Sequence, residues 1–343
     1  MAVAALHVAG LMAASEDRLV LQLRGSGSRV AVRGEVLDRT ADFVEFRLAV
    51  NKEVKRYPVD QVVAILTTRV QPHSRGVSLM KQGLYRAAVE PLQAALKTEN
   101  RRWMRREVLA DLIRCHLEIG DDVAAAELFD ALVRADSDIL HWKLAPLRWS
   151  PTPLTAAEAT FASEALEADS EVLRLIAASW LWQDPARRMA AERVLEALLR
   201  SGDDRVQMLA RVQLWRRDLR QGEITDLRIR HWERTAQRIP IPLRRGPWLL
   251  VARARRLRRE NDLAAATLLW IPSAFPEPRR WAADAIFQAA EALREAGDAA
   301  SAGRLYREVA AEYGETPAGE LAARKFGPSP QPGVSDTDVR SAD

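Results

Sequence analysis

The sequence predicts a mainly α protein, in which helical hairpins stack into an α-solenoid behind a small all-β barrel. Two observations carry this prediction. From about residue 74 onward, apolar residues recur at helical spacing in paired segments, whereas between residues 18 and 66 they alternate with polar residues over short runs. The chain is also dominated by Ala, Leu and Arg, which favour helix. No apolar run reaches the ~18 residues of a membrane-spanning helix, so no transmembrane segment is expected.

The β part is expected over residues 17–70. Five short runs with period-two alternation are separated by turn signals, which is typical of a small antiparallel β domain; they centre on residues 19–23, 30–36, 44–48, 57–59 and 62–66. The stretch from Arg29 to Leu66 resembles the small SH3-like or Sm-like barrels that precede repeats in some bacterial proteins. Gly34 falls where a strongly bent strand needs a residue without a side chain. RNA-binding Sm proteins carry an Asp and an Asn after the second strand; residues 38–43 contain no Asn, which argues against RNA binding by that route.

The helical part repeats one pattern. A Gly is followed by a small residue five positions later, a bulky one nine later and an apolar one twelve later. The pattern occurs at Gly83, Ala88, Leu92 and Ala95, and again at Gly297, Ala302, Tyr306 and Val309. It resembles the tetratricopeptide repeat (TPR), a two-helix unit that stacks into a solenoid. The resemblance implies a protein that binds and positions partners without doing chemistry.

Six hairpins are expected, two in residues 74–136 and four in residues 157–326. The first two turn at Gly83 and Gly120, which are 37 residues apart, slightly more than the usual repeat of 34. In the fifth hairpin Asn261 is expected to take the left-handed conformation that Gly supplies elsewhere. Residues 137–156 are rich in Pro and are expected to form a linker between two subarrays, after which Thr155 and Glu158 form a capping box that restarts a helix.

The two ends of the chain are expected to differ from the rest. Residues 1–16 are rich in Ala and apolar residues and resemble a truncated secretory signal or, alternatively, a short lead-in. Residues 305–323 are similar to the TPR units of exported bacterial envelope proteins, so a periplasmic or cell-envelope location is favoured over a cytoplasmic one. Residues 327–343 are rich in Gly, Pro, Ser and Asp and are expected to be a disordered tail.

The sequence contains no motif for catalysis, a metal or a cofactor. The five His are scattered and lack the Cys or carboxylate company of a zinc site. Phosphate-binding Gly-rich loops and nucleophile elbows are absent from the sequence. The acidic pairs at 121–122 and 203–204 sit where they would cap helix starts, and the single Cys115 is expected to be a small buried hydrophobe. A non-enzymatic protein without cofactors is therefore expected.

Ten Trp residues are spread over the chain, and most are expected to pack between hairpins. Trp180 is the exception. Aligned to the repeat, it takes an outward position on a first helix, so it is expected on the concave face of the solenoid as a partner-binding residue.

Arginine is concentrated between residues 228 and 259, where eleven Arg stand against one acid, Glu233. By the repeat pattern a subset of arginines falls toward the concave face, with Arg114 in a matching place. The expected partner-binding arginines are Arg216, Arg220, Arg255, Arg258, Arg259 and Arg294. In the TPR family this face holds extended peptides, and the planar fork of Arg suits carboxylate or phosphate.

The function expected from the sequence is therefore a scaffold or adaptor that holds a protein or peptide with acidic or carboxylate groups. Three alternatives stay open. The basic residues could form a solvated face without a ligand. They could bind nucleic acid or another polyanion together with the β barrel. The chain could also self-assemble through the ends of the solenoid, which an apolar patch at residues 310–326 would favour.

Overall fold

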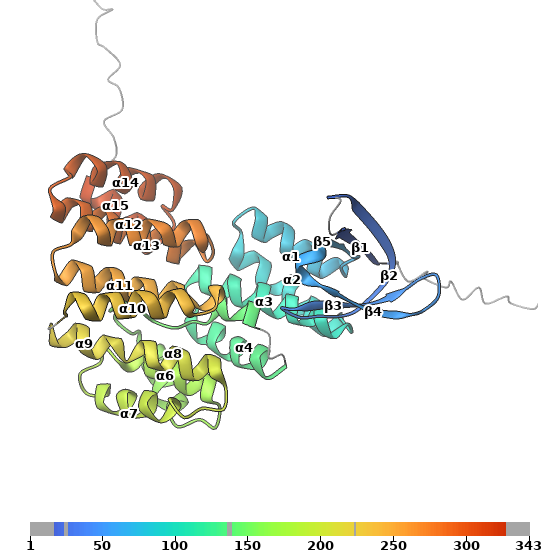
Figure 1. Cartoon of the computed structure of the whole chain (residues 1–343), viewed down its shortest axis with the longest axis horizontal. Helices are drawn as coiled ribbons and strands as arrows, with labels where there is room; N and C mark the ends of the chain where they lie inside the picture. The colour runs from blue at the N-terminus through green and yellow to red at the C-terminus, as the bar shows by residue number, and fades with distance from the viewer. Residues whose placement is uncertain (1–16, 24–26, 136–138, 223, 327–343) are drawn as a thin grey trace, which may run out of the picture. The chain divides into compact units, whose positions relative to one another are not determined.

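The computed structural model describes residues 17–23, 27–135, 139–222 and 224–326 (Figure 1). The expected lead-in at 1–16 and the expected tail at 327–343 lie outside these residues. The chain divides into two compact units, Met1–Leu112 with Ala135–Leu140, and Ile113–Arg134 with His141–Asp343. The division falls inside one helix, α3 (Arg102–Ile119).

The first unit contains an antiparallel sheet of five strands in the order β4-β3-β2-β1-β5 (Figure 1). The strands are β1 (Asp17–Gln22), β2 (Arg29–Arg39), β3 (Phe43–Leu48), β4 (Val54–Pro58) and β5 (Val62–Leu66). The expected small all-β domain with five short strands is thus confirmed as an antiparallel sheet.

Strand β2 changes partners at Gly34. Its first half pairs with β1 and its second half with β3, so that Gly34 faces both Asp17 and Leu48. A Cβ at Gly34 would lie 2.0 Å from the carbonyl oxygen of Arg47 and 2.6 Å from the ring of Phe46. The bend therefore requires a residue without a side chain, as the sequence predicted.

The core of the first unit joins this sheet to a helix. Val36 and Phe46 are buried in one cluster with Trp103 and Met104 of α3. The indole Nε1 of Trp103 donates a hydrogen bond of 3.1 Å to the carbonyl oxygen of Val36. The first helical hairpin, α1 (Gln71–Lys81) and α2 (Tyr85–Thr98), belongs to the same unit.

Helices dominate the second unit, so the prediction of a mainly α protein with a small β domain is confirmed. After α3 and α4 (Asp122–Ala135), successive helices pack on one another from α5 to α8 and again from α10 to α15 (Figure 1). They are α5 (Ala156–Ala165), α6 (Glu171–Leu181), α7 (Arg188–Leu198), α8 (Asp204–Gln213), α9 (Trp215–Gln221), α10 (Asp226–Arg238), α11 (Arg245–Leu257), α12 (Asn261–Ala274), α13 (Arg279–Ala296), α14 (Ala299–Glu312) and α15 (Pro317–Phe326). Among the described residues, no helix is both long and apolar enough to cross a membrane.

Most hairpin turns contain the left-handed Gly that the sequence predicts. Gly83, Gly120, Gly222 and Gly297 have φ values between 75° and 93°. The prediction for Asn261 is wrong. Asn261 is the first residue of α12, and the left-handed residue is Arg259, with φ 61°. The turn lies two residues earlier than expected because α11 ends at Leu257.

Residues 141–155 of the Pro-rich stretch between α4 and α5 belong to the second unit. The stretch contains the 3-10 helix η2 (Ile139–Leu144), and residues 145–155 after it form no regular helix or strand. Buried apolar side chains line it, including Trp142, Leu147 and Trp149. Thr155 and Glu158 form both hydrogen bonds of the expected capping box at the start of α5.

Candidate functional site

A pocket of about 650 Å³ opens in the second unit and is called the large pocket here. Its walls are residues 147–153 of the Pro-rich stretch, the facing sides of α11 and α13, and the start of α15; Asp122 of α4 lies in its lining. Five arginines line it: Arg148, Arg245, Arg253, Arg256 and Arg280. The arginines come from three separate parts of the chain, so only folding brings them together.

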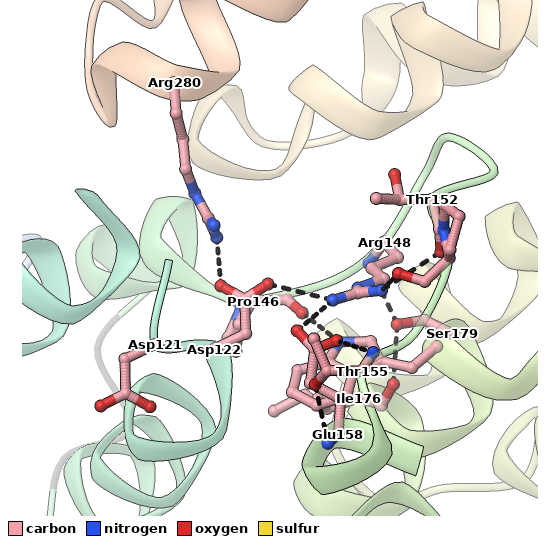
Figure 2. Close-up of polar contacts among 12 residues, drawn as sticks. Asp121, Asp122, Pro146, Arg148, Thr152, Thr155, Glu158, Ile176, Ser179 and Arg280 are labelled. Carbon is pink, nitrogen blue, oxygen red and sulfur yellow. Dashed lines mark hydrogen bonds and ion pairs between the residues drawn. The ribbon is translucent and has the colours of Figure 1, made fainter. Parts of the chain in front are cut away.

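An ion-pair network holds one side of the large pocket in place (Figure 2). Arg148 lies between two carboxylates: its Nη2 is 3.3 Å from Oδ2 of Asp122, and the same nitrogen pairs with Glu158. Arg280 reaches the other oxygen of Asp122 from α13. All these side chains are mostly buried. Because each charge has an opposite partner, burial costs less than it would for an isolated ion.

Backbone contacts fix the Pro-rich stretch beside this network. The amide of Arg148 donates to Oγ of Ser179 at 3.1 Å, and Nε1 of Trp180 donates to the carbonyl oxygen of Pro146 at 2.7 Å (Figure 2). Trp149 packs on Gly246 so closely that a Cβ there would lie 2.0 Å from its ring. The wall is therefore built from rigid contacts to α6 and α11.

The α11 wall carries positive charge over an aromatic surface. The guanidinium of Arg245 lies 3.5 Å from the centroid of the Trp281 ring, a cation–π contact. Burial, with Arg280 nearby, lowers the pKa of Arg245 to about 9, which leaves the group charged at neutral pH. About two turns further on, Arg253 donates to the carbonyl oxygen of Trp149 at 3.0 Å and has its pKa lowered by burial.

Besides Asp122 of α4, the large pocket has two acids in its lining, and both come from α13. Burial raises the pKa of Asp284, while a hydrogen bond of 2.7 Å from Gln288 acts in the opposite direction. Glu291 is also partly buried, but its contacts with Lys325, Tyr306 and Arg294 lower its pKa. Asp284 lies within the electrostatic influence of Arg245 and Arg253 but forms no ion pair of 4.0 Å or less with either of these described residues.

Apolar side chains complete the lining of the large pocket. They are Leu147, Trp149, Leu249, Trp281, Phe287 and Leu321, together with Pro residues of the Pro-rich stretch. Leu321 is 47% exposed although it is a large apolar residue. A surface that combines aromatic faces with guanidinium groups can bind an extended segment carrying both apolar and acidic side chains.

Two of the predicted site arginines have carboxylate partners inside the protein. Arg255 pairs with Glu233 and, at 3.3 Å, with Glu260. Arg258 lies 2.7 Å from Asp226 and 2.9 Å from Glu260. The sequence stretch is basic, but acids from neighbouring turns neutralise these side chains.

Two further predicted arginines also lie outside the large pocket. Arg259 is exposed at the left-handed turn after α11. Arg294 is exposed on α13 and pairs with Glu291 at 3.2 Å. Arg255, Arg258, Arg259 and Arg294 therefore line neither of the two pockets described in this section.

The expected orientation of Trp180 is wrong. Its side chain is fully buried, and its ring packs on Phe161 with centroids 5.6 Å apart. Its indole Nε1 donates a hydrogen bond to the carbonyl oxygen of Pro146. The face of α6 that carries Trp180 is not exposed, because the Pro-rich stretch packs against it. The broader expectation of Trp as core is confirmed for the seven buried Trp residues: 103, 142, 149, 180, 182, 215 and 232.

The structure does bring Arg216 and Arg220 together. Both line a second, smaller cavity of about 240 Å³ in the second unit, together with Arg188 and Arg253. Arg216 is only 5% exposed, which the sequence pattern did not predict.

Sequence reasoning missed the residues that form the large pocket. Asp122 was expected only as a helix cap, and Arg148 and Arg280 lie in stretches without a charge cluster. Arg245 and Arg253 fall inside the basic run but were not distinguished from its other members. One signal in the sequence was the isolated Arg between Pro146 and Pro151, since a charge inside an apolar Pro-rich stretch needs a partner.

Comparisons with known proteins add no assignment. No model of a known protein family matches the chain, and no curated protein sequence matches it. In the described part of the chain, no cluster of three or more His, Cys, Asp or Glu side chains is arranged to hold a metal ion.

Proposed function

We propose that this protein is a non-enzymatic adaptor whose TPR-like hairpins hold a segment of a partner protein in the large pocket. The segment would carry acidic or carboxylate groups beside apolar side chains. The observation that carries the proposal is Arg245: a partly buried guanidinium stacked on Trp281 and without an ion pair of 4.0 Å or less to any described carboxylate. A carboxylate of the partner would supply the missing counter-ion.

The surroundings of Arg245 support a peptide rather than a small ion. The volume of about 650 Å³ lies in the range of ligand sites and accommodates several side chains. Exposed Leu321 and the rings of Trp281 and Phe287 offer apolar anchors on the same surface. Aromatic and Arg anchors in a partly desolvated pocket are the residues that carry most binding energy at protein interfaces.

The test uses a fluorescent peptide library in which Asp or Glu alternates with Leu, Phe or Trp, read by fluorescence anisotropy. Arg245→Gln is expected to weaken the best peptide by at least about tenfold, because a charge-assisted hydrogen bond contributes about 1.5–3 kcal/mol. Arg238→Gln, an exposed arginine of the same basic run outside the pocket, is the matched control and is expected to bind like the wild type.

The position of the bound peptide is checked separately. A photo-crosslinking amino acid replaces Leu321, which lines the large pocket, in one variant. In the control variant it replaces Leu263, which is similarly exposed but lies outside the pocket. Crosslinking from position 321 alone supports the proposal. Equal crosslinking from both positions, or no loss of affinity in Arg245→Gln, would show that the peptides bind elsewhere.

A further inference from the structure

The smaller cavity, called the arginine pocket here, is lined by four arginines: Arg188, Arg216, Arg220 and Arg253. None of its lining residues is an Asp or Glu. The four side chains come from α7, α9 and α11, so residues that are up to 65 positions apart in the sequence meet at one cavity. An assembly of four cations without a lining acid is unusual, because like charges repel at short distance.

Arg216 is the most buried of the four. Its Nη1 donates to the carbonyl oxygen of Ser179 and to Oε1 of Gln213, both at 2.8 Å. The guanidinium carbon lies 5.5 Å from the centroid of the Trp182 ring. All these partners are neutral. The contacts hold the guanidinium in place, while its Nε and Nη2 donate to no acceptor among the residues that the structure describes.

The other three members also form no ion pair with an acid among the described residues, although Asp284 acts on Arg253 from beyond that distance. Arg188 donates to the carbonyl oxygen of Trp182 at 2.9 Å, and Arg253 to that of Trp149 at 3.0 Å. Over the described ranges, no carboxylate lies within ion-pair distance of Arg188, Arg216, Arg220 or Arg253. This distinguishes them from Arg217, the neighbour of Arg216, which pairs with Glu192 and Glu196.

The uncompensated charge has an energetic cost. Burial, together with Arg253 and Arg188 nearby, lowers the pKa of Arg216 to about 9. The group is nevertheless charged at neutral pH, so the pocket keeps a strong positive potential inside a partly desolvated site. Buried charges in proteins are normally paired, so an anion is the missing component.

We propose that the arginine pocket binds a small organic dianion, either a phosphate monoester or a dicarboxylate. Guanidinium forks bind both kinds of oxyanion through paired hydrogen bonds. The volume of about 240 Å³ is just below the usual range for drug-sized ligands and therefore suits a small metabolite. Pro151, Leu219 and the Trp182 ring provide an apolar wall for its organic part. This inference goes beyond the proposed function, because it needs no partner protein.

The test is isothermal titration calorimetry of the full-length protein with glycerol phosphate and with succinate, at constant ionic strength set by NaCl. We expect saturable binding of at least one of them and a rise in Tm with its concentration, because a ligand that binds only the folded state stabilises it. Tighter binding of glycerol phosphate would assign the site to phosphate monoesters, and tighter binding of succinate to dicarboxylates.

Variants locate the binding. Arg220→Gln changes an exposed member of the pocket and is expected to lower the affinity at least about tenfold without altering the fold. Arg307→Gln, an exposed arginine on α14, is the control and is expected to bind like the wild type. Arg216→Gln, which keeps an amide donor toward Ser179, should also lose binding. The proposal is overturned if neither anion binds saturably, or if both pocket variants bind as tightly as the control.

Discussion

Arg259 has a backbone φ of 61°, a conformation in which the Cβ of an L-residue crowds the following carbonyl oxygen. Hairpin turns elsewhere in the chain place Gly at this conformation, at Gly120 and Gly297 for example. The side chain of Arg259 is exposed and points to no described acid, so its position is decided by the backbone of the turn.

Replacing Arg259 by Gly is therefore expected to stabilise the protein by about 0.5–1 kcal/mol, because Gly adopts a positive φ without strain. The free energy of unfolding from urea denaturation checks this. Arg307→Gly, at an exposed helical position of α14, is the control and is expected to destabilise by about 1 kcal/mol. A loss of stability in Arg259→Gly would mean that its side chain makes a contribution not visible in its contacts.

The stability of the folded state is expected to depend on pH through Asp284, a residue that lines the large pocket. Burial raises its pKa in the folded state above the ordinary value of 3.8. Between these two pKa values the folded state binds more protons than the unfolded state, so the contribution of Asp284 to stability falls as pH rises through that window.

Asp284→Asn removes this titration. The variant is expected to gain stability relative to the wild type as the pH is raised from about 4 toward neutral, measured as the difference in unfolding free energy at each pH. The control is Asp298→Asn, because hydrogen bonds with Ser301 lower the pKa of the Asp298 carboxylate; its stability difference should change in the opposite direction below about pH 4 and stay nearly constant above it. A pH-independent difference for Asp284→Asn would contradict the argument.

At the scale of elements, β2 and the Pro-rich stretch show how single residues set the course of the chain. The partner change of β2 at Gly34 leaves no room for a Cβ beside Arg47 and Phe46. Gly34→Ala is expected to cost about 1–3 kcal/mol, as other overpacked substitutions do. Hydrogen exchange of the β2 and β3 amides measures the effect. Gly202→Ala, where a Cβ meets nothing within 4 Å, should stay within about 0.5 kcal/mol of the wild type.

The Pro-rich stretch depends on Arg148, which pairs with carboxylates of α4 and α5. Arg148→Met would leave Glu158 as a buried charge without its cation, so a loss of about 3–5 kcal/mol is expected from thermal or urea unfolding. Arg324→Met breaks an ion pair whose side chains are both largely exposed, and it should change stability by less than about 0.5 kcal/mol. Equal effects of the two substitutions would show that the network contributes no more than a surface pair.

At the scale of the whole molecule, part of the basic charge is neutralised by acids of the same chain. The formal net charge is +4, and arginines of the basic run such as Arg255 and Arg258 pair with acids of neighbouring turns. Strong non-specific binding to nucleic acid requires several phosphates to be neutralised by free cations.

We therefore expect the protein to bind duplex DNA only weakly and non-specifically at 150 mM NaCl, with a Kd of about 100 µM or more. Fluorescence anisotropy with a labelled 20-base-pair duplex tests this. Lysozyme, another basic protein, serves as the control. A micromolar Kd with a steep salt dependence would favour the polyanion alternative over the adaptor.

The local features of this protein were largely readable from its sequence. Alternation from Leu19 to Leu66 predicted five short strands, and the Gly-based pattern at Gly83 and Gly297 predicted the hairpin turns, because turn conformation and side-chain periodicity are properties of neighbouring residues. The capping box of Thr155 and Glu158 and the burial of Cys115 were also predicted correctly, for the same local reason.

Only the tertiary structure determined which charged side chains form ion pairs and which do not. Arg255 and Arg216 both lie on helix faces in basic stretches, yet Arg255 meets Glu233 while Arg216 meets only neutral acceptors and other arginines. The sequence predicted an outward-facing Trp180, because periodicity distinguishes the faces of one helix but does not show which other segment packs on each face. The sequence by itself determined the class of the elements and their turns. The two pockets arise from residues far apart in the chain, such as Arg148 and Arg280, and packing places them within contact distance of shared partners.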